Sequence, residues 1–224
     1  MLAARTVFPY RGGFAAAGLL GPTAGANCRR MLVDIVLIPF AWALGTFPTA
    51  VLVARAHGHD VTREGSGNPG ASNVARLVGW RAGALVLVID FAKGAIAAGV
   101  GLAVGGRAGA FALGVAAIVG HTFPLYRKGG KGVATAGGAL VVLYPLIVLG
   151  LAVVWLIVAR LLHKASLASL LGAALFPIAA AAMGYDLWEL LILSGLAILV
   201  ITRHFGNIQR LLRRQENDLG TRPS

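Results

Sequence analysis

Long apolar stretches run through the chain, separated by short segments that hold most of its charged, glycine and small polar residues. Most of the stretches are near the ~20 residues that a helix needs to cross a bilayer. This pattern predicts an all-α integral membrane protein. The stretches are 31–54, 82–104, 109–126, 132–160, 166–183 and 187–202.

The fourth stretch, 132–160, is too long for one crossing and has Tyr144-Pro145 at its middle. Proline removes a backbone donor and breaks or kinks a helix. Basic residues flank the stretch on both sides, and an even number of crossings keeps them on one side of the membrane. We therefore predict two short helices, 132–144 and 146–160, and about seven transmembrane helices in total.

With that split, the basic loops fall on one side of the membrane, whereas the opposite loops hold Arg107, Asp186 and Glu189. Positive residues favour the cytoplasmic side. We therefore expect the N-terminus outside and the C-terminus in the cytoplasm. The basic residues on the cytoplasmic side are Arg55, Arg63, Arg76, Arg81, Arg127, Lys128, Lys131, Arg160, Lys164, Arg203, Arg210, Arg213, Arg214 and Arg222.

Residues 1–30 fit this topology badly because they hold four arginines, which resist export. The chain could naturally start at Met31, or the segment could be a leader with a small-residue site at 24–26, or a disordered tail. We expect an unstructured or mis-started extension at 1–30. The transmembrane domain should cover 31–216, followed by a polar tail at 217–224.

Composition agrees with a membrane protein. The 224 residues are 58% hydrophobic and 12% charged, whereas soluble domains hold about 25% charged residues. The net charge of +12 indicates cytoplasmic anchors and anionic-lipid contacts before nucleic acid, so no nucleic-acid partner is expected. The single Cys28 allows no intramolecular disulfide and no cysteine-built metal site, and we predict no metal site.

The first cytoplasmic loop contains GSGNPGASNVAR at 65–76. Glycines let backbone amides converge on an anion, serine and asparagine add neutral hydrogen bonds, and arginine can bind phosphate through two parallel bonds. A flexible linker is an equally plausible reading of this loop alone. The candidate residues are Ser66, Gly67, Asn68, Gly70, Ser72, Asn73 and Arg76.

The second loop, 120–135, places Gly129-Gly130-Lys131-Gly132 directly before a predicted helix. Backbone amides and the positive end of the helix dipole make an anion site there, with Lys131 as the point charge. Taken singly, Lys131 could also be a lipid-headgroup anchor, and His121 could be a helix-end histidine that bonds the backbone.

The last span leads into RHFGNIQRLLRRQE at 203–216. On a continuing helix, His204 and Asn207 would share a face with Leu211. The basic residues that follow fit an amphipathic helix on the anionic leaflet. In the third basic loop, Ser166 and Ser169 open a helix, where capping is the default role of Ser166.

Inside the second span, Asp90 and Lys93 stand three residues apart. Charges inside a membrane are costly, so we expect an ion pair that faces the bundle interior. A structural and a functional role are equally plausible for this pair.

Four segments together resemble the bacterial acyl-phosphate-dependent glycerol-3-phosphate acyltransferases of the PlsY type, over 31–216. They are GSGNPGASNVAR (65–76), DFAKG (90–94), GHTFP with GGKGVAT (120–135) and RHFGNIQRLLRRQE (203–216), in the order in which the family's motifs occur. The resemblance implies an inner-membrane enzyme with its active site on the cytoplasmic side. It would transfer a fatty acyl group from acyl phosphate to glycerol 3-phosphate, the first acylation step of phospholipid biosynthesis.

Several further expectations follow from the resemblance. The products would be 1-acylglycerol 3-phosphate and phosphate, no cofactor is expected, and an acyl-phosphate-producing enzyme and membrane lipids are the expected partners. The implied catalytic residues are Ser66, Arg76, Lys131, His204 and Asn207. The implied substrate- and phosphate-binding residues are Gly67, Asn68, Gly70, Ser72, Asn73, Val74, His121, Gly129, Gly130, Gly132, Ser166, Ser169 and Glu216.

A transporter or channel and a structural scaffold are the two alternatives to an acyltransferase. A transporter or channel for a phosphorylated anion would also use basic, glycine-rich loops, but it should carry polar groups towards the membrane midplane and on both faces. Here these groups gather on one face. A structural scaffold would leave the phosphate-suited loops without a purpose.

Overall fold

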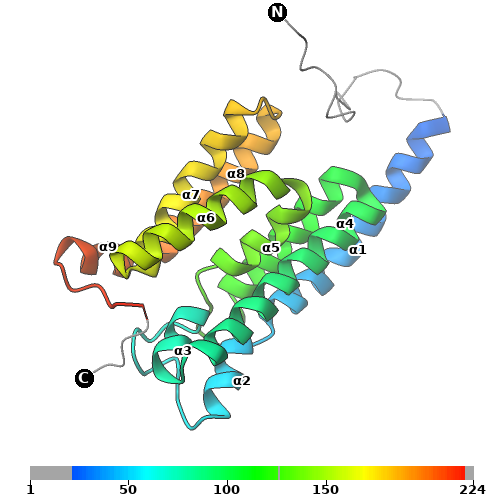
Figure 1. The fold of residues 1–224 in the computed structure, drawn as a ribbon. Coiled ribbons are helices and arrows are strands. Elements are labelled where there is room, and N and C mark those ends of the chain that lie inside the picture. Colours follow the sequence, from blue (N-terminus) through cyan, green and yellow to red (C-terminus); the bar gives the residue numbers. More distant parts are fainter. Residues whose placement is uncertain (1–21, 126, 220–224) are drawn as a thin grey trace, which may run out of the picture.

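The computed structural model describes residues 22–125 and 127–219, and within them every regular element is a helix. Figure 1 shows α1, α4 and α5 packed together, with α6, α7 and α8 forming a second group beside them. The short helices α2, α3 and α9 lie at one end of the molecule. The helices are α1 (Pro22–Thr46), α2 (Thr49–Arg55), α3 (Ala71–Leu77), α4 (Trp80–Thr122), α5 (Val133–Leu143), α6 (Pro145–Leu162), α7 (Ala165–Ala182), α8 (Leu187–Arg203) and α9 (Phe205–Leu212).

Helix α4 is a hairpin of two arms rather than one straight rod. Gly106 has φ 67° and ψ −152°, a conformation that interrupts the helix and that glycine adopts readily. A Cβ on Gly101 would lie 2.2 Å from the carbonyl oxygen of Gly109. Residues eight apart on a straight helix would be about 12 Å apart, so the chain folds back on itself. The arms correspond to the stretches predicted at 82–104 and 109–126.

The division of stretch 132–160 is confirmed. Helix α5 ends at Leu143, Tyr144 has φ −136° and ψ 56°, and α6 begins at Pro145. Proline suits the first position of a helix because its missing N–H would have no partner there. The sequence therefore ends one helix and starts the next within two residues.

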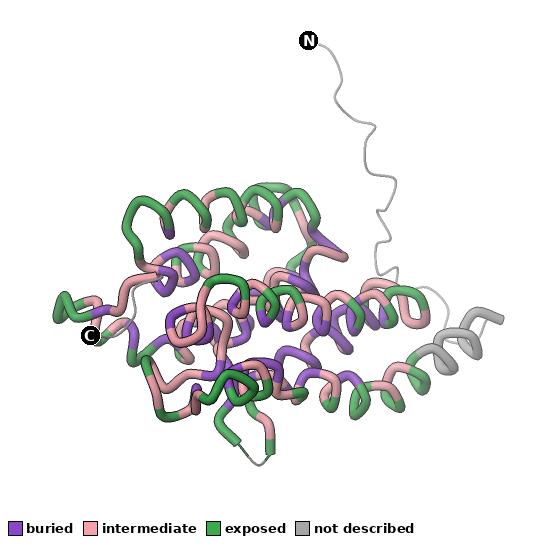
Figure 2. The backbone as a smooth tube through the Cα atoms, turned by 60° about the horizontal axis from the view of Figure 1, so that its bottom comes forward, coloured by how far each residue is buried: buried purple, intermediate pink, exposed green. Residues whose placement is uncertain are grey.

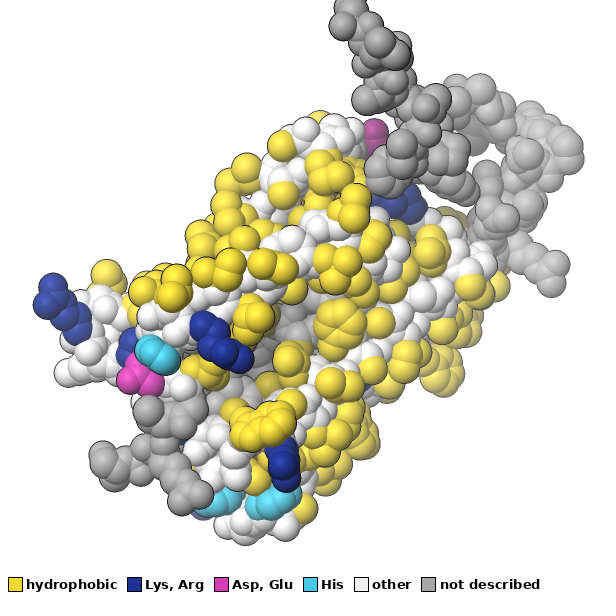
Figure 3. All heavy atoms as spheres, in the orientation of Figure 1, with side chains coloured by type: hydrophobic (Ala, Val, Ile, Leu, Met, Phe, Trp, Pro, Cys, Tyr) yellow, Lys and Arg dark blue, Asp and Glu magenta, His cyan; other side chains and the backbone are white. Residues whose placement is uncertain are grey.

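The surface suits a lipid environment. Buried residues follow the inner faces of the helices, while many outer turns are exposed (Figure 2). Hydrophobic side chains cover the flanks, and most of the visible lysine, arginine and histidine side chains gather at the end that holds α2, α3 and α9 (Figure 3). Large exposed apolar residues include Phe40, Val88, Leu149 and Ile198. Such an apolar exterior marks a membrane-facing surface.

Four described helices are long and apolar enough to cross a membrane, or five if the bent pair of α8 and α9 forms one span. One of these four is the 43-residue α4, which contains both hairpin arms. Helix α5, with 11 residues, falls below that length. The fold is an all-helical, multi-pass membrane fold.

Two expectations about helix ends were wrong. Helix α1 begins at Pro22, so residues 22–30 are helical rather than unstructured; residues 1–21 of the expected extension lie outside the described residues. The last span does not continue through His204, because α8 ends at Arg203 and α9 is bent from it by 58°. The side chain of His204 is buried at this bend, where its ring bonds the Val200 carbonyl.

The predicted ion pair inside the membrane is confirmed. Lys93 Nζ lies 2.6 Å from Asp90 Oδ1, and these residues are 3% and 2% exposed. Lys93 also donates to the carbonyl of Phe47, at the break between α1 and α2. The pair therefore joins α4 to the segment that precedes α2.

Glycines set the distance between α4 and α5. A Cβ on Gly138 would lie 1.8 Å from the carbonyl oxygen of Phe91, and one on Gly94 would lie 1.9 Å from that of Thr135. Small residues allow such close backbone contact between membrane helices. The helix that follows the lysine-bearing loop is thus held directly against the first arm of α4.

We expect Gly138→Val to separate α4 from α5 and to lower the midpoint of thermal unfolding in detergent by roughly 5–10 °C, as overpacking does. Gly150→Val is the matched control, because a Cβ on Gly150 meets no atom within 4 Å. Equal midpoints for the two variants, measured by fluorescence on heating, would contradict this packing.

Candidate active site

A cavity of about 590 Å³ opens between the two groups of helices, where Figure 3 shows a hollow. Its walls come from α3, both arms of α4, α5, α6, α7, α8, α9 and the chain after α9. One end is polar and is built from the loops that precede α3, α5 and α7. The rest is lined mainly by aliphatic and aromatic side chains.

The first loop is organised by Asn73, which is 2% exposed. Its Nδ2 donates to the carbonyls of Val61 and Glu64 at 3.1 and 3.0 Å. Its Oδ1 accepts from the Ser66 amide at 2.9 Å. Gly65 and Gly67 both have positive φ, 59° and 62°, which explains why the loop needs glycine there. These contacts give the loop a defined hydrogen-bonded conformation.

Arg76 is buried on α3 and directs its guanidinium towards the polar end. Its Nη1 donates to Asn73 Oδ1 at 3.2 Å, while Nε and Nη2 donate to the backbone carbonyl of Asp218 at 3.3 and 3.1 Å. Burial lowers the pKa of Arg76, which nevertheless stays charged at neutral pH. In the described residues its donors meet only neutral acceptors.

The second loop packs tightly on the end of α4. A Cβ on Gly129 would lie 2.1 Å from the Thr122 carbonyl oxygen, and one on Gly130 would lie 2.1 Å from the ring of His121. Gly132 has φ 84° and leads into α5. These three glycines explain how the loop can turn so closely beside His121, which also lines the cavity.

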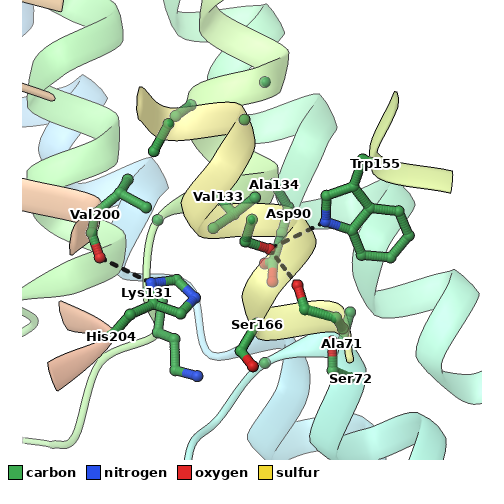
Figure 4. A pocket seen from close by; sticks show the side chains of 18 of the residues that line it. Ala71, Ser72, Asp90, Lys131, Val133, Ala134, Trp155, Ser166, Val200 and His204 are labelled. Atoms are coloured by element: carbon green, nitrogen blue, oxygen red, sulfur yellow. Dashed lines mark hydrogen bonds between the residues drawn. The ribbon is translucent and has the colours of Figure 1, made fainter. Parts of the chain in front are cut away.

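Lys131 lies between these glycines, and Figure 4 shows it beside His204 in the same part of the cavity. Its Nζ donates to Asn207 Oδ1 at 2.6 Å. Burial lowers the pKa of Lys131 to about 8, an effect that the nearby Glu216 carboxylate partly offsets. Lys131 is therefore a cation whose charge can be lost in mildly alkaline solution.

Glu216 connects the last helix to the third loop. Its carboxylate accepts from Asn207 Nδ2 at 2.6 Å, Ser166 Oγ at 3.0 Å and Arg210 Nε at 2.9 Å. The expectation that Ser166 caps α7 was wrong, because Lys164 occupies the N-cap position and the Ser166 hydroxyl points to Glu216 instead. A carboxylate repels phosphate, so these contacts support a positioning role for Glu216.

His204 Nδ1 lies 2.8 Å from the Val200 carbonyl, which can only accept a hydrogen bond (Figure 4). The hydrogen therefore sits on Nδ1, and Nε2 keeps a lone pair. Burial, followed by the positive charge of Lys131, lowers the pKa of His204 to about 4. The ring is neutral at pH 7 and is a weak base.

Three helices begin at the polar end. Residues at the starts of α3, α5 and α7 line the cavity, and in the described chain no side chain caps any of these starts. Free amides and the positive ends of helix dipoles attract anions. Figure 4 shows Ser72, Lys131 and Ser166, from three separate segments, around this space.

Most of the residues expected from the sequence line this one cavity. Gly67, Val74, Gly129 and Gly130 lie behind its wall, where they shape the loops or pack beneath them. Those that line it are Ser66, Asn68, Gly70, Ser72, Asn73, Arg76, His121, Lys131, Gly132, Ser166, Ser169, His204, Asn207 and Glu216.

Sequence reasoning missed the contribution of the chain after Glu216. Lys164 Nζ donates to Asp218 Oδ1 at 2.6 Å and to the Glu216 carbonyl, and the Leu219 amide donates to the His163 carbonyl at 2.7 Å. The segment 217–219 is thereby held beside Arg76. Only its polar composition was visible in the sequence, and polarity alone does not indicate which residues it contacts.

The apolar part of the cavity runs away from the polar end between α5, α6, α7 and α8. It is lined by Leu140, Val148, Leu151, Phe176, Leu193 and Leu196. Among the described residues, no group of three or more histidine, cysteine or acidic residues is placed to hold a metal ion. The cavity therefore combines an anion-binding end with a groove suited to a hydrocarbon chain.

This chain is similar to known acyltransferases over most of its length. Residues 35–214 match the family described as Glycerol-3-phosphate acyltransferase. The glycerol-3-phosphate acyltransferase of Jannaschia sp. is 42% identical, with 80% of this chain and 90% of the relative covered. That of Methylococcus capsulatus is 41% identical, with coverage of 86% and 99%.

Solved structures give the same result. The crystal structure of PlsY, an integral membrane glycerol 3-phosphate acyltransferase, in its glycerol 3-phosphate form superposes with a TM-score of 0.79 at 34% identity, covering 84% of this chain and 96% of that one. Its lysophosphatidic acid form gives a TM-score of 0.77 at 35% identity, with the same coverage. The family match, the relatives and the shared fold together show that this chain belongs to the glycerol-3-phosphate acyltransferase family.

Proposed function

We propose that this protein transfers a fatty acyl group from acyl phosphate to the 1-hydroxyl of glycerol 3-phosphate, giving 1-acylglycerol 3-phosphate and inorganic phosphate. As a member of its family it acylates glycerol 3-phosphate. The observation that carries the proposal is the cavity, in which a cationic end with free helix amides continues into an apolar groove. Both proposed substrates carry phosphate, and one also carries a hydrocarbon chain.

The polar end has groups for two phosphates. Arg76 and the backbone at the start of α3 form one set, and Lys131 with the amides at the start of α5 forms the other. Ser66 and Ser166 add hydroxyls, and Asn207 holds Lys131 in place. We propose these residues as the phosphate-binding and catalytic set, with the acyl chain in the groove between α5 and α8.

Acyl phosphate is a mixed anhydride, so the enzyme has to position the reactants and neutralise the leaving phosphate. The 1-hydroxyl oxygen attacks the acyl carbonyl carbon, the new C–O ester bond forms, and the bond from that carbon to the phosphate oxygen breaks. A substrate phosphate oxygen accepts the hydroxyl proton. Arg76 and Lys131 offset the charge on the departing phosphate, while His204 Nε2 accepts a hydrogen bond from the 2-hydroxyl and so orients glycerol 3-phosphate.

The site would face the cytoplasm of a bacterial inner membrane. Supporting this, the polar end adjoins the loops with Arg63, Lys128 and Lys164, whereas Arg107 lies at the far turn of α4. With the two arms of α4 and α5 counted as separate crossings, the helices would give seven crossings, an outside N-terminus and a cytoplasmic C-terminus. An acyl-phosphate-producing enzyme would supply the donor.

The reaction is tested with purified protein in lipid nanodiscs, palmitoyl phosphate and labelled glycerol 3-phosphate. We expect labelled lysophosphatidate from palmitoyl phosphate and none from palmitoyl-CoA. Arg76→Ala should lower the rate at least ~100-fold, because it removes a charged donor from the site. Arg81→Ala, at an exposed position, should leave the rate unchanged. If product forms from palmitoyl-CoA but not from palmitoyl phosphate, acyl phosphate is not the donor.

The lowered pKa of Lys131 predicts a pH above which activity falls, here called the alkaline limit. Lys131 is charged below pH 8 and neutral above it, so kcat/KM for glycerol 3-phosphate should fall as pH rises through about 8. Lys131→Arg keeps its charge and should move this limit to higher pH, although its rate at neutral pH is lower. Lys128→Arg, at an exposed position, is the control. The idea fails if Lys131→Arg keeps the wild-type alkaline limit.

The role of His204 is tested with His204→Gln. If His204 only orients glycerol 3-phosphate, kcat at saturating glycerol 3-phosphate should fall less than about tenfold while KM rises. Loss of a general base would instead lower kcat by 10²–10⁴. Steady-state kinetics distinguish the two, with Phe205→Gln, at the exposed neighbouring position, as the control.

A further inference from the structure

The apolar groove stops at the same level on four helices. Its last lining residue is Leu140 on α5, Val148 on α6, Phe176 on α7 and Leu193 on α8. One helical turn beyond these residues lie Tyr144, which follows α5 and precedes α6, Ala180 on α7 and Glu189 on α8. None of these three lines the cavity, and they are 1%, 0% and 2% exposed.

At and beyond that level lies an aromatic plug, which we define as Tyr144, Phe176 and Tyr185 with the ion pair of Arg107 and Glu189. The Tyr144 ring centre lies 5.7 Å from that of Phe176 and 4.8 Å from that of Tyr185, both edge to face. Phe176 is the member of the plug that faces the cavity. Tyr144 packs directly against it, and the other members contact Tyr144.

Polar contacts fix the plug in place. Arg107 donates to both carboxylate oxygens of Glu189 at 2.5 and 2.8 Å, and the Tyr144 hydroxyl donates to Glu189 Oε2 at 2.5 Å. The Arg107 guanidinium also lies 5.1 Å from the Tyr144 ring centre. Glu189 is buried, whereas Arg107 is partly exposed. Moving the plug would leave the Glu189 carboxylate without its partners in an apolar surrounding, which is costly.

We propose that the aromatic plug limits the length of the acyl chain that the enzyme accepts, with Phe176 as the residue that the chain end meets. The proposal rests on the acyltransferase function above and adds the selection of its donor. From Ser166 at the polar end to Phe176 is ten residues of α7, or about 15 Å of helix. A chain that enters at the polar end and follows this groove reaches the plug.

The test uses acyl phosphates with dodecanoyl, palmitoyl and stearoyl chains, and measures the ratio of kcat/KM for stearoyl to that for dodecanoyl. Phe176→Ala opens the floor and should raise this ratio roughly tenfold, the lower end of the effect of one methylene in an apolar pocket. Phe176→Trp fills the end of the groove and should lower the ratio. Tyr144→Phe keeps the ring but loses the bond to Glu189, and should raise the ratio less than Phe176→Ala.

Ile178→Ala is the matched control, since Ile178 is exposed on the same helix, two residues from Phe176. Its ratio should equal the wild-type ratio. Unchanged ratios in active Phe176→Ala and Phe176→Trp would overturn the proposal and show that the chain leaves the groove sideways into the bilayer. If the wild-type enzyme gives no product with acyl phosphates, the proposed donor is wrong, and the same ratio is then measured with the acyl donor that does give product. The chain-length proposal is thus tested separately from the donor.

Discussion

The mutual repulsion of closely placed cations is the constraint on which the polar end of this protein depends. Arg76, Lys131 and Arg210 all converge there, and close like charges destabilise one another. The buried carboxylate of Glu216 offsets this repulsion and also bonds Ser166 and Asn207. One anion therefore links α7, α9 and, through Asn207, the lysine-bearing loop, while the remaining positive charge is left to attract phosphate.

Much of the fold follows from patterns that can be read locally. Apolar stretches place the helices, Tyr144-Pro145 divides α5 from α6, and glycines mark the loops that need positive φ. The bend at His204 could not be predicted in this way, because RHFGN contains no proline and its glycine follows the bend. The burial of His204 depends on neighbours that are distant in the sequence.

In the site, too, residue types could be recognised from the sequence but their contacts could not. The phosphate-suited residues were recognisable because their types suit anions, and the structure brings most of them to one cavity. The contacts that hold these residues could not be recognised, since Ser166 bonds Glu216, which is 50 residues away in the sequence. Arg107 and Glu189 looked like ordinary charges of the opposite loops. Their bidentate pairing joins residues 82 apart, and single-residue patterns carry no information on such partners.

The contact between Arg76 and Asp218 has a consequence for the order of assembly. Most helix packing joins neighbours along the chain, as in the pairs α4 with α5 and α6 with α7, so it can form soon after each helix is made. The bond from Arg76 to the Asp218 carbonyl joins residues 142 apart. Synthesis proceeds from the N-terminus, and domains fold as they emerge. A nascent chain therefore has a packed bundle before it has a complete phosphate site, and Arg76 gains its last partner only when Asp218 has left the ribosome.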